Sequence, residues 1–169
     1  MDRYVFYDTD IEGYEEYDIR GEAYEKLIRL CCQYGAVLYL KFTHPDLSAY
    51  NSLKNFEIPK PQNIPDDPAQ IGPYCDKRYF TVCPELCDIL LHIAGGIFEW
   101  MSGRDNLKNP DDPTFYRADG TVFFASEIHE GVCVLAPRTG EDAADVLDAI
   151  DWITGVRETV LSVDKVNHL

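Results

Sequence analysis

The sequence predicts an α+β fold in which a mixed or antiparallel sheet packs against three to four helices. In the first half of the chain, short apolar segments typical of strands alternate with segments whose apolar residues recur at helical spacing. In the second half, three short strand-like segments form a meander with only turn sequences between them. A chain of 169 residues with 46% hydrophobic residues can build one core, so we expect residues 1–169 to form a single domain.

The first half contains two predicted strands and one well-defined helix. Residues 4–7 form a short apolar strand segment. From residue 22 to residue 34 the apolar side chains follow helical spacing, and Gly35 stands where a left-handed residue often ends a helix. Residues 36–42 are apolar on both alternating faces apart from Lys41, which predicts a strand covered on both sides.

A second helix is expected from Thr43 as N-cap, with Pro45 in the first turn and Asp46 as the capping acid. Its buried face would consist of Leu47, Tyr50, Leu53 and Phe56. Between residues 58 and 74, five prolines remove backbone donors and predict a long loop. Loops of this length are often functional, but a plain surface excursion explains the prolines equally well.

The remaining elements follow in simple order. Residues 78–82 predict a strand, and Pro84 begins a helix that Gly95 and Gly96 end. A hairpin is predicted from residues 114–117 and 121–126 with a turn at Asp119 and Gly120, and residues 132–135 form the next strand. Thr139 and Asp142 suggest the start of a last helix that reaches about residue 153.

The charge of the chain limits its partners. Thirty acidic and fifteen basic residues give a net charge of −15, which opposes binding to nucleic acid or anionic membranes and attracts a basic protein. The competing explanation of this net charge is that it serves only to keep the protein soluble. The chain opens without an apolar leader and has no stretch long enough to span a membrane, so we expect a cytoplasmic protein. Its six cysteines are expected to be reduced and mostly buried.

One motif suggests catalysis. A hydrophobic strand ends in Asp8 and Asp10, a pair that can offer a nucleophile and a Mg²⁺ ligand. This resembles the first motif of haloacid-dehalogenase-type phosphatases. The resemblance implies Asp8 as nucleophile, Asp10 as acid/base, Thr43 at the phosphate and acids within residues 140–145 at the metal. The chain departs from the family pattern, because Ile11 and Glu12 stand where a glycine and a threonine belong.

Two other groups of reactive side chains favour structural roles. Cys83 and Cys87 lie one helical turn apart, but the close cysteine pairs of zinc sites are missing. We therefore expect no metal site formed by Cys75, Cys83, Cys87 and His92. His129 and Glu130 could pair as base and orienting acid near Cys133, although a structured turn explains the segment as well. We therefore expect neither a cofactor nor a metal.

Two acidic segments are the predicted partner-binding residues. The first interleaves carboxylates with tyrosines, a composition suited to protein interfaces, and comprises Asp10, Glu12, Tyr14, Glu15, Glu16 and Tyr17. The second places acids three residues apart on the last predicted helix, at Asp142, Asp145, Asp148 and Asp151. Like charges at this spacing destabilise a helix modestly, which suggests an interaction surface beside the simpler explanation of a solvated face.

The hairpin over residues 117–124 and the segment over residues 128–131 resemble small acidic bacterial proteins, among them immunity proteins of polymorphic toxin systems. This resemblance implies an inhibitor that blocks a basic toxin domain and needs no active site. An acidic face would speed its association with such a partner. The function predicted from the sequence is thus an acidic protein-binding module, and the alternative is a small Mg²⁺-dependent phosphohydrolase that uses Asp8 and Asp10.

Overall fold

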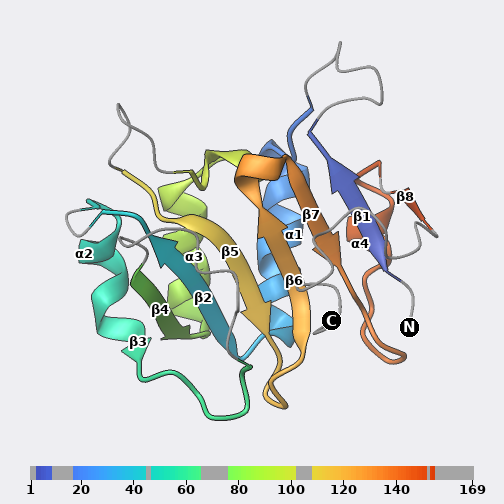
Figure 1. Ribbon diagram of the computed structural model, residues 1–169. Coiled ribbons are helices and arrows are strands. Elements are labelled where there is room, and N and C mark those ends of the chain that lie inside the picture. The colour runs from blue at the N-terminus through green and yellow to red at the C-terminus, as the bar shows by residue number, and fades with distance from the viewer. Residues whose placement is uncertain are drawn as a thin grey trace.

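The protein is described by a computed structural model that covers residues 3–8, 17–44, 47–65, 76–101, 108–151 and 153–154. The strands are β1 Tyr4–Tyr7, β2 Val37–Phe42, β3 Glu57–Ile58, β4 Asp76–Thr81, β5 Asp111–Tyr116, β6 Val122–Glu127, β7 Val132–Leu135 and β8 Ile153–Thr154. They form one sheet in the order β3-β4-β2-β5-β6-β7-β1-β8 (Figure 1). Every pair of neighbouring strands is antiparallel, so the predicted α+β class is confirmed and the sheet is of the antiparallel kind.

Four α-helices lie within the described residues: α1 Gly21–Tyr34, α2 Tyr50–Leu53, α3 Pro84–Ile93 and α4 Ala144–Leu147. Short 3₁₀ turns add η1 Lys54–Phe56, η2 Ile97–Glu99 and η3 Ile128–Glu130. Helices α1 and α3 lie behind the sheet in Figure 1 and pack against each other. Among these residues, none of the helices is both long enough and apolar enough to cross a membrane.

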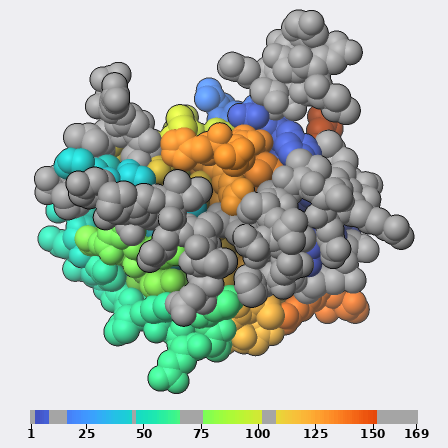
Figure 2. Space-filling model, in the orientation of Figure 1, coloured from blue at the N-terminus to red at the C-terminus, as the bar shows by residue number. Residues whose placement is uncertain are grey.

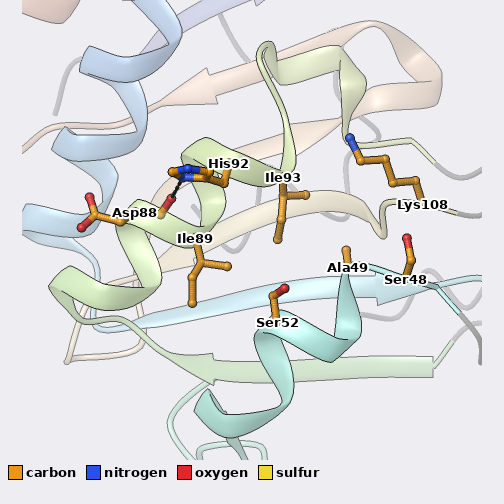
Figure 3. A pocket seen from close by; sticks show the side chains of 8 residues that line it. All are labelled: Ser48, Ala49, Ser52, Asp88, Ile89, His92, Ile93 and Lys108. Carbon is orange, nitrogen blue, oxygen red and sulfur yellow. Dashed lines mark hydrogen bonds between the residues drawn. The ribbon is translucent and has the colours of Figure 1, made fainter.

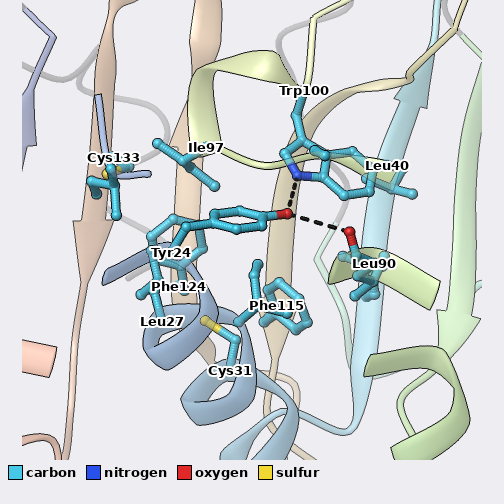
Figure 4. Close-up of a cluster of buried hydrophobic side chains, with 14 of the residues drawn as sticks. Tyr24, Leu27, Cys31, Leu40, Leu90, Ile97, Trp100, Phe115, Phe124 and Cys133 are labelled. Atoms are coloured by element: carbon cyan, nitrogen blue, oxygen red, sulfur yellow. Dashed lines mark hydrogen bonds between the residues drawn. The ribbon is translucent and has the colours of Figure 1, made fainter. Parts of the chain in front are cut away.

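The main core lies between the sheet and the helices. Its helical side is the buried face of α1, with Leu27 and Cys31 fully enclosed, as the periodicity predicts. Two linked hydrogen bonds lie within this core (Figure 4), and in the first the Trp100 indole Nε1 donates to the Tyr24 hydroxyl at 2.9 Å. The hydroxyl in turn lies 3.4 Å from the Leu90 carbonyl oxygen, so both buried polar groups are satisfied.

The opposite face of the sheet is covered as well, where the first part of the proline-rich loop lies over it. Tyr39 of β2 and Tyr79 of β4 point to this face with ring centroids 5.4 Å apart, and Ile64 packs against them. Ile64 is only 2% exposed. Figure 2 shows this loop segment in green at the lower rim of the molecule. The prediction that residues 36–42 are covered on both sides is therefore confirmed, and the loop residues 59–65 provide part of the cover.

Gly120 marks the place where this loop meets the β5–β6 turn. Its φ of +83° lies in the left-handed region, and a side chain there would collide with the Asn63 carbonyl. The Asn63 amide also donates to the Ala118 carbonyl at 3.0 Å. A glycine is thus needed at this turn for its conformation and for the close approach of the loop.

The ends of α1 differ from expectation in one respect. The helix ends at Tyr34 as predicted, but Gly35 has a φ of −79° and is extended rather than left-handed. A Cβ atom at Gly35 would lie 2.6 Å from the Cys31 carbonyl and close to the Phe115 side chain. The glycine is needed because the chain passes close to the core there.

Two predicted helices are shorter than their sequence patterns indicate. The helix expected from Thr43 begins only at Tyr50; Pro45 and Asp46 lie outside the described residues. It passes into η1 within four residues, because β3 follows directly and pairs with β4. Asparagine, serine and tyrosine in this segment also have weak helix propensity.

The sequence predicts a last helix that reaches about residue 153, but α4 ends at Leu147. The chain then turns, and β8 pairs with Tyr4 and Val5 at the sheet edge. Acidic side chains at the C-terminal end of a helix are repelled by its dipole, and pairing with β1 supplies other backbone hydrogen bonds. The predicted hairpin, the third meander strand and α3 are confirmed.

Candidate interaction surface

The second acidic segment forms an exposed surface that we call the C-terminal acidic face. It consists of Asp142, Asp145, Asp148 and Asp151, all of which are exposed. The same segment is held to the core on its inner side by Ala143, Val146 and Ile150, which are buried. Because apolar and acidic residues alternate around the segment, the carboxylates must face outward.

The N-terminal part of the C-terminal acidic face is fixed to α1. The Asp142 backbone N–H donates to the Tyr34 hydroxyl at 2.9 Å, and the Asp142 carboxylate accepts the Ala144 N–H at 3.2 Å. A small hollow of about 300 Å³ separates this part from α1 and is lined in part by Lys26 and Arg29. The pKa of Lys26 is raised by its hydrogen bond to Glu22 and further by the charge of Asp145. Positive side chains of α1 therefore partly offset Asp142 and Asp145.

At the C-terminal part of this face, the negative charge is less compensated by positive side chains. Within the described chain, Asp148 and Asp151 form no ion pair, and both are exposed. Asp148 follows α4 directly, where the helix dipole adds to the negative potential. This end of the face is thus the more negative of the two.

Glu141, which neighbours the face, has a structural task instead. The Arg117 guanidinium donates two hydrogen bonds of 2.6 Å to the Glu141 carboxylate. It also donates to the carbonyl oxygens of Val122 and Ala136. Arg117 is 6% exposed and lies against the Phe123 ring. The arginine that begins the predicted hairpin turn is therefore a buried anchor between this turn and the segment that leads into α4.

The first acidic segment is mostly outside the described residues. Asp10, Glu12, Tyr14, Glu15 and Glu16 all fall there. Tyr17 is described: its side chain is 46% exposed and its N–H donates to the Asp8 carbonyl. Of the residues predicted to bind a partner, the structure thus describes Tyr17 and the C-terminal acidic face.

Asp8 lies at the end of β1, and Asp10 is not among the described residues. The Asp8 N–H donates to the Gly131 carbonyl, and its carboxylate lies directly beside the Gly131 Cα. Thr43 follows β2, and β2 and β1 end at the same end of the sheet. The two strands are four positions apart in the sheet, which separates Thr43 from Asp8 by roughly 19 Å at ordinary strand spacing. Residues 140–145 follow β7, whose last residue pairs with Tyr4 at the opposite end of β1. The structure does not bring these phosphatase-like positions together.

His129 finds a partner other than the predicted one. Its Nε2 lies 3.4 Å from the Asp111 carboxylate, while Glu130 is exposed. Cys133 lies in the main core and burial raises the pKa of its thiol. The segment from Ile128 to Gly131 is the 3₁₀ turn η3 followed by a left-handed glycine, which fits a structured turn.

Asp111 and Asp112 form a buried ionic cluster that sequence reasoning missed. Asp112 accepts hydrogen bonds from Lys41 at 2.5 Å and from the Ile128 N–H at 2.7 Å, and its φ of 54° is rare for a residue with a side chain. The signal was present in the sequence: Lys41 is the one charge in an apolar strand segment, and the two acids stand between Pro110 and Pro113. A buried charge needs a partner of opposite sign.

The cysteines are packed thiols in the part of the chain that the structure describes. Cys31, Cys87 and Cys133 are buried, Cys32 and Cys83 are half-buried, and Cys75 lies outside the described residues. Burial raises the pKa of the Cys31 and Cys32 thiols, which disfavours their reactive thiolate forms. No group of three or more metal-ligating side chains occurs among the described residues.

Comparison of the chain with protein-family models, with curated proteins and with solved structures found no match.

Proposed function

We propose that this protein is an acidic binding module that neutralises a basic partner protein, most concretely as an immunity-type inhibitor of a basic toxin domain. The observation that carries the proposal is the C-terminal acidic face, where exposed carboxylates stand on a segment anchored by buried apolar residues. A preformed surface loses little conformational entropy when it binds. The partner would approach with lysines and arginines toward Asp148 and Asp151.

The net charge supports the same proposal. At −15 the whole chain attracts a cationic protein over a distance of about one Debye length, and the exposed face orients it on arrival. Blocking a partner in this way requires area and charge complementarity but no chemistry. An inhibitor of this kind would act in the cytoplasm of the cell that makes the toxin.

The first test is affinity capture from the lysate of the source organism, with elution by a salt gradient. We expect a stoichiometric basic protein that leaves the column as salt rises, because screening weakens the charge contacts. The captured protein is then titrated against the doubly neutralised variant Asp148→Asn/Asp151→Asn. We expect affinity to fall roughly three- to tenfold, mainly through slower association.

A control separates this face from net charge alone. The variant Glu85→Gln/Glu130→Gln removes the same two charges from exposed positions on α3 and η3. It should bind almost as well as the unchanged protein. A blank capture at low salt, or equal losses in both variants, would count against the proposal.

A further inference from the structure

Helices α1 and α3 bring together two segments that lie far apart in the sequence. The two helices pack against each other behind the sheet (Figure 1). At the rim of their contact, the Arg29 guanidinium of α1 lies 3.8 Å from the Asp88 carboxylate of α3. Figure 3 shows the Asp88 side chain extending from α3 toward α1, the blue helix. Residue 29 of α1 therefore faces residue 88 of α3.

This alignment places the thiols of Cys32 and Cys87 side by side. Cys32 follows Arg29 by three positions and lies on the same side of α1, and Cys87 directly precedes Asp88 in α3. A hydrogen bond joins the two thiols, and the Arg29 guanidinium is close enough to Cys87 to interact with it electrostatically. A disulfide needs β-carbons roughly 3.5–4.5 Å apart, so thiols already in contact are the ones that can form it with little movement of the backbone.

The neighbouring cysteines have different surroundings. Cys31 precedes Cys32 in α1 but is fully buried and points into the main core (Figure 4). The Cys83 thiol, one helical turn before Cys87, donates a hydrogen bond to the Glu85 carboxylate. Of the cysteines that the structure describes, Cys32 and Cys87 are therefore the pair best placed for a disulfide.

The two thiols differ in their access to solvent. Cys32 is half-buried, so a small oxidant can reach its sulfur, whereas Cys87 is only 5% exposed. Burial raises the pKa of the Cys32 thiol, and the neighbouring Cys87 raises it further. Because the thiolate is the reactive form, Cys32 reacts slowly and stays reduced until a strong oxidant is present.

We propose that Cys32 and Cys87 form a reversible disulfide between α1 and α3 when the protein meets hydrogen peroxide. The Cys32 sulfur attacks one peroxide oxygen and the O–O bond breaks, which gives a sulfenic acid and one water. The Cys87 sulfur then attacks the Cys32 sulfur, the S–O bond breaks, and the hydroxyl group leaves with the Cys87 proton as a second water. Two thiols and one peroxide thus give one disulfide and two waters, and a dithiol reduces the disulfide again.

The disulfide makes the stability of the fold depend on the redox conditions around it. A cross-link between residues 32 and 87 closes a long loop and lowers the conformational entropy of the unfolded chain. It also joins the two helices that cover the main core. This inference is independent of the proposed partner binding, because no residue of the C-terminal acidic face takes part in it.

The test is oxidation of the full chain with excess hydrogen peroxide, followed by alkylation of the remaining thiols and tryptic digestion without reductant. Trypsin releases Cys32 in peptide 30–41 and Cys87 in peptide 79–104. We expect mass spectrometry to find these two peptides cross-linked, and dithiothreitol to separate them. Calorimetry should show a Tm that is higher by roughly 5–10 °C in the oxidised protein and returns to its first value after reduction.

Three variants identify the cysteines, because each tryptic peptide contains a second one, Cys31 or Cys83. Cys32→Ala should abolish the cross-link and leave Cys87 reduced, since Cys87 is shielded from the oxidant. Cys87→Ala should also abolish the cross-link and leave the sulfenic acid on Cys32, where dimedone traps it. Cys83→Ala is the matched control on α3 and should keep both the cross-link and the rise in Tm.

Each variant removes a single sulfur atom, so the fold should survive, and circular dichroism before oxidation checks this. The proposal is overturned if the unchanged protein forms no cross-link, if the cross-link persists in Cys32→Ala or Cys87→Ala, or if it is lost in Cys83→Ala. A lower Tm after oxidation would also contradict it, because the native packing of α1 on α3 would then not accommodate the bond.

Discussion

Arg117 shows how one residue can join distant segments. It begins the β5–β6 turn, yet its guanidinium reaches the carbonyl of Ala136 and the carboxylate of Glu141. Arg138 extends the contact, since its N–H donates to the same Glu141 carboxylate. The hairpin turn therefore supplies Arg117 to a buried ion pair with Glu141, which links the turn to the start of the C-terminal acidic face.

Replacing Glu141 by glutamine should destabilise the protein by about 2 kcal/mol at neutral pH, because the buried Arg117 loses its charged partner. Hydrogen bonds from Arg117 hold the pKa of Glu141 below its ordinary value of 4.5. A carboxylate with a lowered pKa stabilises the fold above that ordinary value, and the contribution disappears as pH falls through the lowered pKa. Urea unfolding across acidic pH should show the two proteins converge there.

The exposed Asp145 offers the matched control for Glu141, because Asp145→Asn removes one charge from the same segment without a buried partner. The free energy of unfolding of the Asp145→Asn variant should differ little from that of the unchanged protein at any pH. If Glu141→Gln cost no more than Asp145→Asn, the Arg117 pair would not be a stabilising contact.

The loop over residues 59–65 behaves as a packing element although it contains neither helix nor a further strand. Ile64 of this loop packs against Tyr39 and Tyr79, and the Asn63 side chain holds the loop to the β5–β6 turn by a hydrogen bond. Prolines explain why this segment forms no regular structure, but they say nothing about where it lies. Its position comes from the apolar face that β2 and β4 would otherwise expose.

Shortening Ile64 to alanine should destabilise the fold by about 2–4 kcal/mol, since the side chain is buried and its removal leaves a cavity. Ile58→Ala, at a half-buried position of the same cluster, should cost clearly less. Urea unfolding gives the stabilities, and hydrogen exchange of residues 59–65 should rise in the Ile64 variant. Equal small losses in both variants would mean that the loop does not seal this face.

The charge of the whole molecule opposes its own compactness. A net charge of −15 at neutral pH brings like charges together on folding, and the exposed aspartates of the C-terminal acidic face contribute to that repulsion. The buried pairs, Lys41 with Asp112 and Arg117 with Glu141, are largely shielded from salt. Added salt should therefore screen repulsion more than attraction.

Raising NaCl from about 0.01 M to about 1 M shortens the Debye length from about 30 Å to about 3 Å. We expect a stabilisation of about 1 kcal/mol, which corresponds to a rise in Tm of roughly 2–4 °C for a chain of this size. Calorimetry in NaCl and in KCl at equal ionic strength would check this and exclude binding of one particular cation. A lower Tm in salt would mean that exposed ion pairs outweigh the repulsion.

The sequence by itself determined the elements whose apolar periodicity is strong and local. The spacing of Leu27, Ile28 and Cys31 specified α1, and the turn residues Asp119 and Gly120 specified the β5–β6 hairpin. Local patterns succeed there because the buried face and the turn conformation depend on residues close in the chain. They also predicted the exposed aspartates of the C-terminal acidic face.

Only the tertiary structure decided which distant residues meet. The helix α4 ends early because Ile153 and Thr154 pair with β1, and His129 lies beside Asp111 in place of Glu130. Partners of buried charges and the hydrogen bonds of strands are settled by long-range contacts, which no local periodicity encodes. The residues that make the surfaces of this protein were visible in its sequence, but their neighbours were not.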